Sequence, residues 1–443
     1  MEQNDNTTIS SHRARGKNLG VPELIAIALG GMVGGGIFTI LGISVAMIGV
    51  YTPLSIIIGA LIASLAAYSY IKLGVFYRDE GATYSFFKRT FPQSPLAASL
   101  IGWWVMFGYI STLALYSYTF ASYAISSTAS SDTEWVRKAV AGAVLVVFTL
   151  INLWSVKGMG KIEDIMVYTK LIILAVISFL LINHANASLP TLIDDSGEVT
   201  LMAILVASSI TFVAYEGFQL VINAVNEMDQ PERNIPRAIY AAIFLAAAIY
   251  AVISLGAILA IPFDEIIRNE EYALAAGADD LLGHWGTELI IVGALLATSS
   301  AISGTVFGAS RQMAVIAADG YLPRPLAHRA GRVPTRAIIT MSSLAFLLVL
   351  VGSLQQILEF GSVTFLLVSL LMAAANYKIR LKTGASRALT ILAIAGLSMG
   401  TLLILYYEAI NQPRQLGFVV GLYLLLSLGA WLYARHHSRV SRR

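Results

Sequence analysis

Long apolar segments dominate this sequence. Runs of about 20 mostly apolar residues are the length that crosses a bilayer as a helix. We find twelve such runs, near residues 21–49, 53–77, 95–125, 138–156, 162–183, 200–226, 236–261, 286–316, 335–352, 358–379, 388–408 and 415–434. Charged residues make up 12% of the chain, whereas a soluble domain carries about 25%. The sequence therefore predicts an all-α polytopic membrane protein with twelve transmembrane helices.

The basic residues are distributed unevenly between the two sets of connections. Most of the 29 lysines and arginines fall at the two termini or in the connections that share their side. The opposite side holds only Arg137, Lys138, Arg268 and Arg414. Because basic loops remain in the cytoplasm, both termini are predicted to be cytoplasmic, with tails at residues 1–20 and 435–443. We expect a multi-pass protein of the plasma (inner) membrane.

The first span is interrupted by the glycine-rich run Gly30-Gly31-Met32-Val33-Gly34-Gly35-Gly36-Ile37-Phe38. Backbone groups freed by such a break find no water in hydrocarbon, so the break is expected where they line a cavity. A half-helix starting near Gly36 would direct free N–H groups and a positive dipole end at an anion. This pattern predicts a site for a substrate carboxylate. The spacing of Gly30 with Gly34 also fits close packing against a neighbouring helix.

The sixth span carries a second interruption, Ser208-Ser209-Ile210-Thr211-Phe212-Val213-Ala214-Tyr215-Glu216-Gly217-Phe218. The first and sixth spans open two five-span halves, residues 21–183 and 200–380, and residues 388–434 form the last two spans. Paired interruptions at equivalent positions are typical of transporters built on inverted repeats, which favours binding at the first break. Glu216 leaves three roles open: pairing with a cationic substrate, shuttling a proton, or hydrogen bonding to a neighbouring helix as a neutral acid.

A single lysine lies deep in the fifth span. Lys170 follows Lys161 by nine residues, which places it roughly 13 Å along the helix. An ionisable residue at that depth is a functional candidate by default. The alternative is that the side chain snorkels to the interface, although its stem is only several ångströms long. Since a poorly solvated ammonium gives up its proton more readily than one in water, Lys170 is a candidate proton carrier.

The sequence lacks the residues that several kinds of catalytic, metal and cofactor site require. The chain has no cysteine, so neither a disulfide-linked subunit nor a thiolate metal site is expected. The histidines fall in tails or loops, at positions 12, 184, 284, 328, 436 and 437, which argues against a metal cage. No phosphate loop, dinucleotide motif or nucleophile–base set is present. We therefore expect no enzyme activity, no cofactor, no metal and no nucleic-acid partner.

Four ordered motifs resemble the amino acid–polyamine–organocation (APC) superfamily, over residues 17–380 at least. They are Gly34-Gly35-Gly36-Ile37-Phe38; Phe212 to Phe218; Asn226-Glu227 to Pro231 with Ile235-Pro236-Arg237-Ala238; and Arg311 to Ala317 with Asp319-Gly320-Tyr321-Leu322-Pro323 and Val333-Pro334-Thr335. Within the superfamily, the sequence is most similar to archaeal-type proton-coupled amino acid transporters of broad specificity.

The resemblance implies a LeuT-like fold, with two inverted five-helix repeats, discontinuous helices 1 and 6, and two further helices. It implies a substrate site at the two breaks. Backbone amides around Gly34, Gly35 and Gly36, with Ile37, would bind the α-carboxylate. Carbonyls near Phe212, Val213 and Tyr215, beside Gly217, would bind the α-amino group, and Phe212 or Tyr215 would be the aromatic gate. Lys170 would contact Ser299 or Ser300 and act in proton coupling. Glu216 departs from the family pattern.

The function expected is secondary active transport of amino acids, with proton-coupled uptake by alternating access. Its partners would be an amino acid, protons and the lipid bilayer. Two alternatives share the fold: an amino acid exchanger, and a transporter of cationic amino acids or polyamines that uses Glu216 as a counter-charge. Sodium coupling is disfavoured because an ammonium at Lys170 would repel a cation there. A membrane-embedded sensor that binds amino acids without transporting them is a further alternative.

Overall fold

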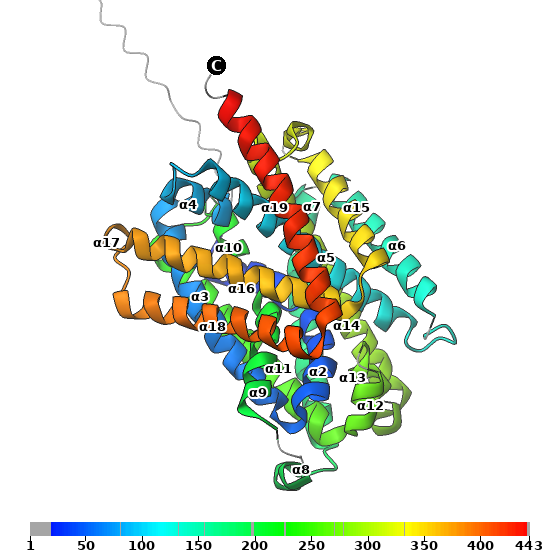
Figure 1. Ribbon diagram of the computed structural model, residues 1–443. Coiled ribbons are helices and arrows are strands. Elements are labelled where there is room, and N and C mark those ends of the chain that lie inside the picture. Colours follow the sequence, from blue (N-terminus) through cyan, green and yellow to red (C-terminus); the bar gives the residue numbers. More distant parts are fainter. Residues whose placement is uncertain are drawn as a thin grey trace, which may run out of the picture.

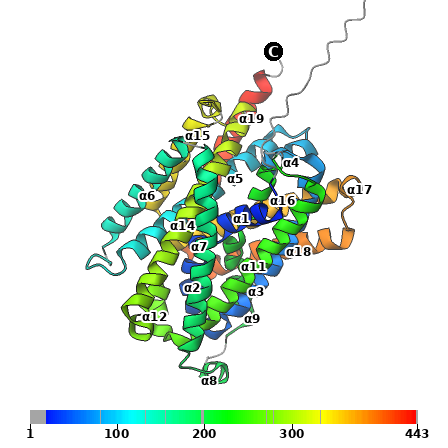
Figure 2. The same cartoon turned by 180° about the vertical axis from the view of Figure 1, so that it is seen from behind.

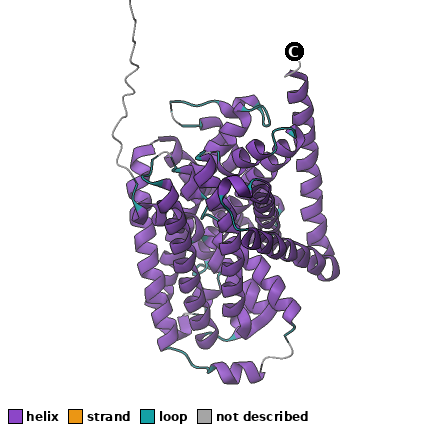
Figure 3. Ribbon diagram, turned by 90° about the vertical axis from the view of Figure 1, so that its left-hand side faces the viewer, coloured by secondary structure: helices purple, strands orange, loops and turns teal. Residues whose placement is uncertain are grey.

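The computed structural model describes residues 19–440, apart from residues 80, 132, 155, 196–198, 226, 270, 278 and 332. This part of the chain consists of helices and their connections (Figure 3). Its only extended pairings are two isolated bridges, Leu19 with Met228 and Ala330 with Val333. The prediction of an all-helical polytopic membrane protein is confirmed.

The elements follow one another in this order: α1 (Val21–Met32), α2 (Gly35–Ile48), η1 (Gly49–Tyr51), α3 (Thr52–Tyr77), α4 (Ala82–Thr90), α5 (Pro95–Ile125), α6 (Glu134–Trp154), α7 (Val156–Asn183), α8 (Leu189–Asp195), α9 (Leu201–Thr211), η2 (Phe212–Tyr215), α10 (Leu220–Asn223), α11 (Pro231–Ala260), α12 (Phe263–Arg268), α13 (Ala273–Ala276), α14 (Asp279–Ala318), η3 (Arg324–Ala327), α15 (Thr335–Val351), α16 (Leu354–Lys378), α17 (Arg380–Thr383), α18 (Arg387–Asn411) and α19 (Pro413–Val440).

Among the described residues, ten segments are long and apolar enough to cross a membrane. One of them, Gly35–Tyr77, contains both α2 and α3, and two shorter apolar helices are Val21–Met32 (α1) and Thr335–Val351 (α15). Asn226, which belongs to one of the sequence motifs, lies outside the described residues.

The helices pack into a bundle whose two ends differ. In Figures 1 and 2, α4 and the end of α19 lie at one end of the bundle, and α8 and α12 lie at the other. We name the first the inner end and the second the outer end, after the distribution of basic residues. Helix α1 lies in the interior, where most of its side chains are buried. Helices α6 and α15 lie side by side at the edge.

Asp319 joins two segments at the inner end. Its carboxylate lies 2.7 Å from Lys88 Nζ and accepts a hydrogen bond of 2.9 Å from the Tyr84 hydroxyl. Burial, and secondarily the charge of Asp319, raise the pKa of Tyr84 well above its usual value, so this hydroxyl stays protonated and donates. Trp103 Nε1 donates to the carbonyl of Tyr321 (2.8 Å) in the same connection. Helix α4 is therefore tied to the connection that follows α14.

At the outer end, Arg137 joins separate segments of the chain, as Asp319 does at the inner end. Its guanidinium lies 2.7 Å from Glu271 and 2.8 Å from Glu134, and its side chain is only 7% exposed. The Tyr118 hydroxyl on α5 contacts both carboxylates, at 3.1 to 3.2 Å. This cluster connects α5 and α6 with the segment between α12 and α13.

We expect Glu271→Gln to lower the free energy of unfolding by about 1 kcal/mol, because it removes one of the charges facing a buried guanidinium. Thermal unfolding of the purified protein in detergent measures this change. Glu288→Gln is the matched control, since the side chain of Glu288 is 44% exposed and that of its partner His284 is 80% exposed. Equal effects of the two substitutions would contradict the assigned importance of the Arg137 cluster.

Candidate functional site

The two interruptions predicted from the sequence meet in the bundle. Helix α1 ends at Met32 and α2 begins at Gly35, so the first break covers Val33 and Gly34. In the second break, Gly217 has a φ of +127°, and a Cβ added there would lie 2.5 Å from the carbonyl carbon of Gly31. Any larger residue would overlap that backbone. The two breaks therefore cross backbone against backbone.

Lys170 on α7 reaches the carbonyl groups at the first break. The side chain is fully buried, and its Nζ donates to the carbonyls of Val33 (2.6 Å) and Gly30 (3.2 Å) and to Ser300 Oγ (2.6 Å). Of the two serines expected near this lysine, Ser300 makes the contact. Ser299 precedes it by one residue, which turns its side chain about 100° around α14. The ammonium thus joins α1, α7 and α14.

Two tyrosines bind the remaining carbonyls at the end of α1. The Tyr116 hydroxyl on α5 donates to the carbonyl of Gly31 (3.0 Å), and the Tyr250 hydroxyl on α11 donates to that of Met32 (2.8 Å). The Tyr250 oxygen also lies 3.3 Å from the carbonyl of Ala214 in η2. The last carbonyls of a helix have no partner within it, and here side chains from three other helices supply the partners.

The amides at the start of α2 differ from these carbonyls. The amide of Gly34 donates to the carbonyl of Met32 (2.9 Å). For the amides of Gly35, Gly36 and Ile37, the described part of the chain provides no acceptor among its side chains or loops. They form the first turn of a 14-residue helix, where N–H groups are unpaired and the dipole is positive. A carboxylate of a ligand fits the charge and hydrogen-bonding capacity of this turn.

The aromatic residues of the second break are buried. Phe212 and Tyr215 are both 0% exposed. The Tyr215 hydroxyl donates to the carbonyl of Ile56 on α3 (2.9 Å), which ties this ring to α3. The carbonyl of Val213 accepts from the amide of Glu216 (3.1 Å). Of the two candidate gates, Tyr215 is held by a hydrogen bond to another helix.

Glu216 lies in a small polar cluster at the second break. It is 4% exposed, and its Oε2 accepts a hydrogen bond of 2.6 Å from Gln219 Nε2. The same Nε2 lies 3.2 Å from the Tyr109 hydroxyl, and Gln219 Oε1 accepts from the amide of Gly217 (3.1 Å). Gln219 therefore connects the carboxyl group to the backbone of the break.

Sequence reasoning did not single out Tyr250 or Gln219. A signal was present for each: Tyr250 carries a hydroxyl group within the apolar run from Ala241 to Ile253, and Gln219 places an amide directly after the second break, between Phe218 and Leu220. Tyr116 is one of several aromatic residues of the third span, and no local pattern distinguishes it from the others.

Comparison with known proteins identifies the family. A family model described as amino acid permease matches residues 19–412. The chain belongs to this family. It is 27% identical to an uncharacterized protein of Methanocaldococcus jannaschii, with 97% of each chain covered. It is 29% identical to the inner membrane transport protein YbaT of Escherichia coli (95% of this chain and 97% of the relative). It is 24% identical to the branched-chain amino acid permease BcaP of Bacillus subtilis (98% and 96%).

Membership of the permease family confirms the resemblance to the APC superfamily. The chain is a transporter and not an enzyme, and the family description and the named permeases support transport of amino acids. The crossing breaks described above are therefore a candidate substrate site in a membrane transporter.

We expect Gly217→Ala to lower the free energy of unfolding by about 2 kcal/mol or more, because the added Cβ combines a disfavoured φ with overlap on the backbone of Gly31. Gly331→Ala is the control: Gly331 has a φ of +63° and no heavy atom within 4 Å of an added Cβ. This control should cost only about 1 kcal/mol. Thermal unfolding of both variants distinguishes overlap from backbone strain, and similar losses would contradict the crossing of the two breaks.

Proposed function

We propose that the chain is a secondary active transporter that takes up amino acids together with protons by alternating access. Two inverted five-helix repeats, α1–α7 and α9–α16, would form a LeuT-like core, and α18 and α19 would add two helices. Counting α1 with α2, and α9 with α10, as single discontinuous spans gives twelve. The family match and the two interrupted helices support this arrangement. The basic residues support a plasma-membrane location with both termini in the cytoplasm.

One observation carries the proton coupling: the Lys170 ammonium is bound at the first break. Its bonds to the carbonyls of Gly30 and Val33 place a cation at the negative end of α1, where the helix dipole favours it. Loss of the proton would remove that charge and one donor. The contact of α1 with α7 and Ser300 would then weaken. Protonation would in this way set how firmly α1 is held, which is the change alternating access requires.

The substrate would bind across the two breaks. Its carboxylate would accept hydrogen bonds from the amides of Gly35, Gly36 and Ile37 at the positive end of α2. Its amino group would approach the backbone of η2, near Phe212, Val213 and Tyr215. The support for this placement is the set of unpaired amides at the start of α2 and the close packing of the two breaks.

Glu216 favours a second candidate, transport of cationic amino acids or polyamines. A buried carboxylate beside the proposed amino-group position could neutralise a substrate's second positive charge. Its hydrogen bond from Gln219 supports a different role, in which Glu216 holds the backbone of the break. We favour the role in which Glu216 holds the backbone of the break, because Gln219 already joins the carboxyl group to the Gly217 amide.

An amino acid exchanger of the same fold would show counterflow without net uptake driven by a pH gradient.

We expect Lys170→Ala to reduce uptake driven by a pH gradient by roughly tenfold or more, because charge-assisted hydrogen bonds contribute about 1.5 to 3 kcal/mol each. Uptake into proteoliposomes, with and without an imposed gradient, is the measurement. Lys138→Ala at the outer end is the control and should leave uptake unchanged. Gradient-driven uptake that persists at full rate in Lys170→Ala would falsify the coupling role.

We expect Glu216→Gln to retain binding of neutral amino acids, because glutamine also accepts a hydrogen bond from Gln219. The measurement is thermal stabilisation by each of the amino acids and several polyamines at two pH values. A ligand at 100 times its Kd stabilises by about 2.7 kcal/mol. A selective loss of stabilisation by lysine, arginine or polyamines in this variant would instead support the cationic-substrate candidate.

A further inference from the structure

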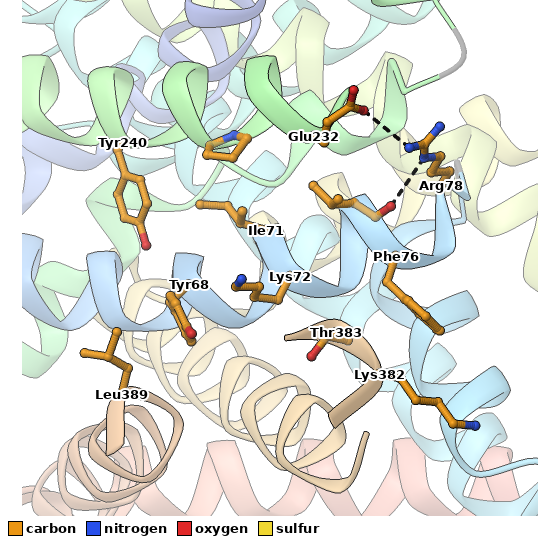
Figure 4. Close-up of a pocket in the computed structure, with 12 residues that line it drawn as sticks. Tyr68, Ile71, Lys72, Phe76, Arg78, Glu232, Tyr240, Lys382, Thr383 and Leu389 are labelled. Atoms are coloured by element: carbon orange, nitrogen blue, oxygen red, sulfur yellow. Dashed lines mark hydrogen bonds and ion pairs between the residues drawn. The ribbon is translucent and has the colours of Figure 1, made fainter. Parts of the chain in front are cut away.

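A surface cavity lies outside the proposed substrate site, at the inner end between α3, α11 and the α17–α18 segment (Figure 4). Its volume is about 640 Å³. In Figure 4, Tyr240 extends from α11 toward α3, and Lys72 lies beside Tyr68. The polar and charged part of its lining includes Tyr68, Lys72, Arg78, Glu232, Tyr240 and Lys382.

The charged lining residues leave an excess of positive charge. Arg78 and Glu232 pair with each other at 3.3 Å. Lys72 Nζ donates to the carbonyl of Gly384 (3.2 Å) and lies 5.9 Å from the centre of the Tyr68 ring. Over the residues that the structure describes, neither Lys72 nor Lys382 has a carboxylate partner. The cavity therefore offers Lys72 to an anion, and Lys382 lies at its rim, where Figure 4 shows its side chain extending away from Lys72.

The cavity is polar near the inner ends of α3 and α11 and becomes apolar deeper along these helices. Arg78 follows the end of α3, whereas Tyr68 lies nine residues before that end, roughly 13 Å deeper. Beyond the tyrosines, the same helix faces continue with exposed apolar side chains. Two turns before Tyr68, Leu61 is 61% exposed, and one turn after Tyr240, Phe244 is 73% exposed. An occupant that matches both parts has an anionic head and a hydrocarbon chain.

We propose that this cavity binds an anionic phospholipid of the inner leaflet. The phosphate lies at Lys72, Lys382 adds positive charge at the rim of the cavity, and the acyl chain runs along the surface marked by Leu61 and Phe244. Basic pockets between membrane helices bind such headgroups. A small soluble anion would leave the apolar surface unused, and a zwitterionic lipid would bring a second cation beside the lysines. The proposal does not depend on proton coupling or on the substrate.

The test is a lipid titration of the full-length, detergent-solubilised protein, followed by thermal unfolding. Phosphatidylglycerol should stabilise the protein more than phosphatidylcholine with the same acyl chains. In the double variant Lys72→Gln/Lys382→Gln, we expect the apparent affinity for phosphatidylglycerol to fall roughly tenfold or more, since each basic residue contributes about 1 kcal/mol to anionic lipid binding. Lys72→Arg keeps the charge and should keep most of the affinity.

Arg324→Gln/Arg329→Gln is the matched control, because it removes the same charge from exposed residues in and after η3, away from the cavity. An equal loss of affinity in this control would show general attraction of the lipid to a basic surface and would overturn the proposal. Absence of any preference for phosphatidylglycerol would do the same. Glycerol phosphate is a third arm: stabilisation by this soluble anion at the same concentration would identify a free-phosphate site in place of a lipid site.

Discussion

Backbone groups freed inside a membrane protein must find partners within that protein, because hydrocarbon offers none. The end of α1 shows how this constraint is met here. Three side chains bind the carbonyl groups of residues 30–33 at this end. They are Lys170 from α7, Tyr116 from α5 and Tyr250 from α11. A single interruption in one helix therefore fixes the position of three others. The bundle is arranged around polar contacts at its centre, although apolar residues make up most of its packing.

The carbonyl and amide sides of the first break have opposite charge preferences. The C-terminal end of α1 is negative and is bound by the Lys170 ammonium, whereas the N-terminal end of α2 is positive and presents unpaired amides. Only Val33 and Gly34 separate these ends. In the proposed mechanism, loss of a proton from Lys170 and binding of a carboxylate at α2 would therefore act on the same two residues. Coupling between a proton and a carboxylate would need no long pathway in such an arrangement.

The sequence predicted the parts of this structure that depend on composition and local pattern. Apolar runs gave the membrane helices, and the glycines of 30–36, with Glu216 and Gly217, located both breaks. The sequence did not predict which side chains on other helices bind the carbonyl groups of the first break. Ser299 and Ser300 are equally polar, and the choice between them depends on a rotation of about 100° about α14. Tyr250 meets Met32 across 218 residues of chain. Such contacts depend on how helices pack, which no single-helix pattern encodes.

Helix α3 connects the second break with the surface cavity through its two faces. On the inward face, the carbonyl of Ile56 accepts the Tyr215 hydroxyl, and the Tyr70 ring packs edge-on against Phe218 at 5.4 Å. On the outward face, Tyr68 and Lys72 line the cavity. The two faces belong to one continuous helix, so a lipid held at the outward face would also restrain the partners of the second break. Binding energy at the surface would then favour the bundle arrangement in which α3 and the break are in contact.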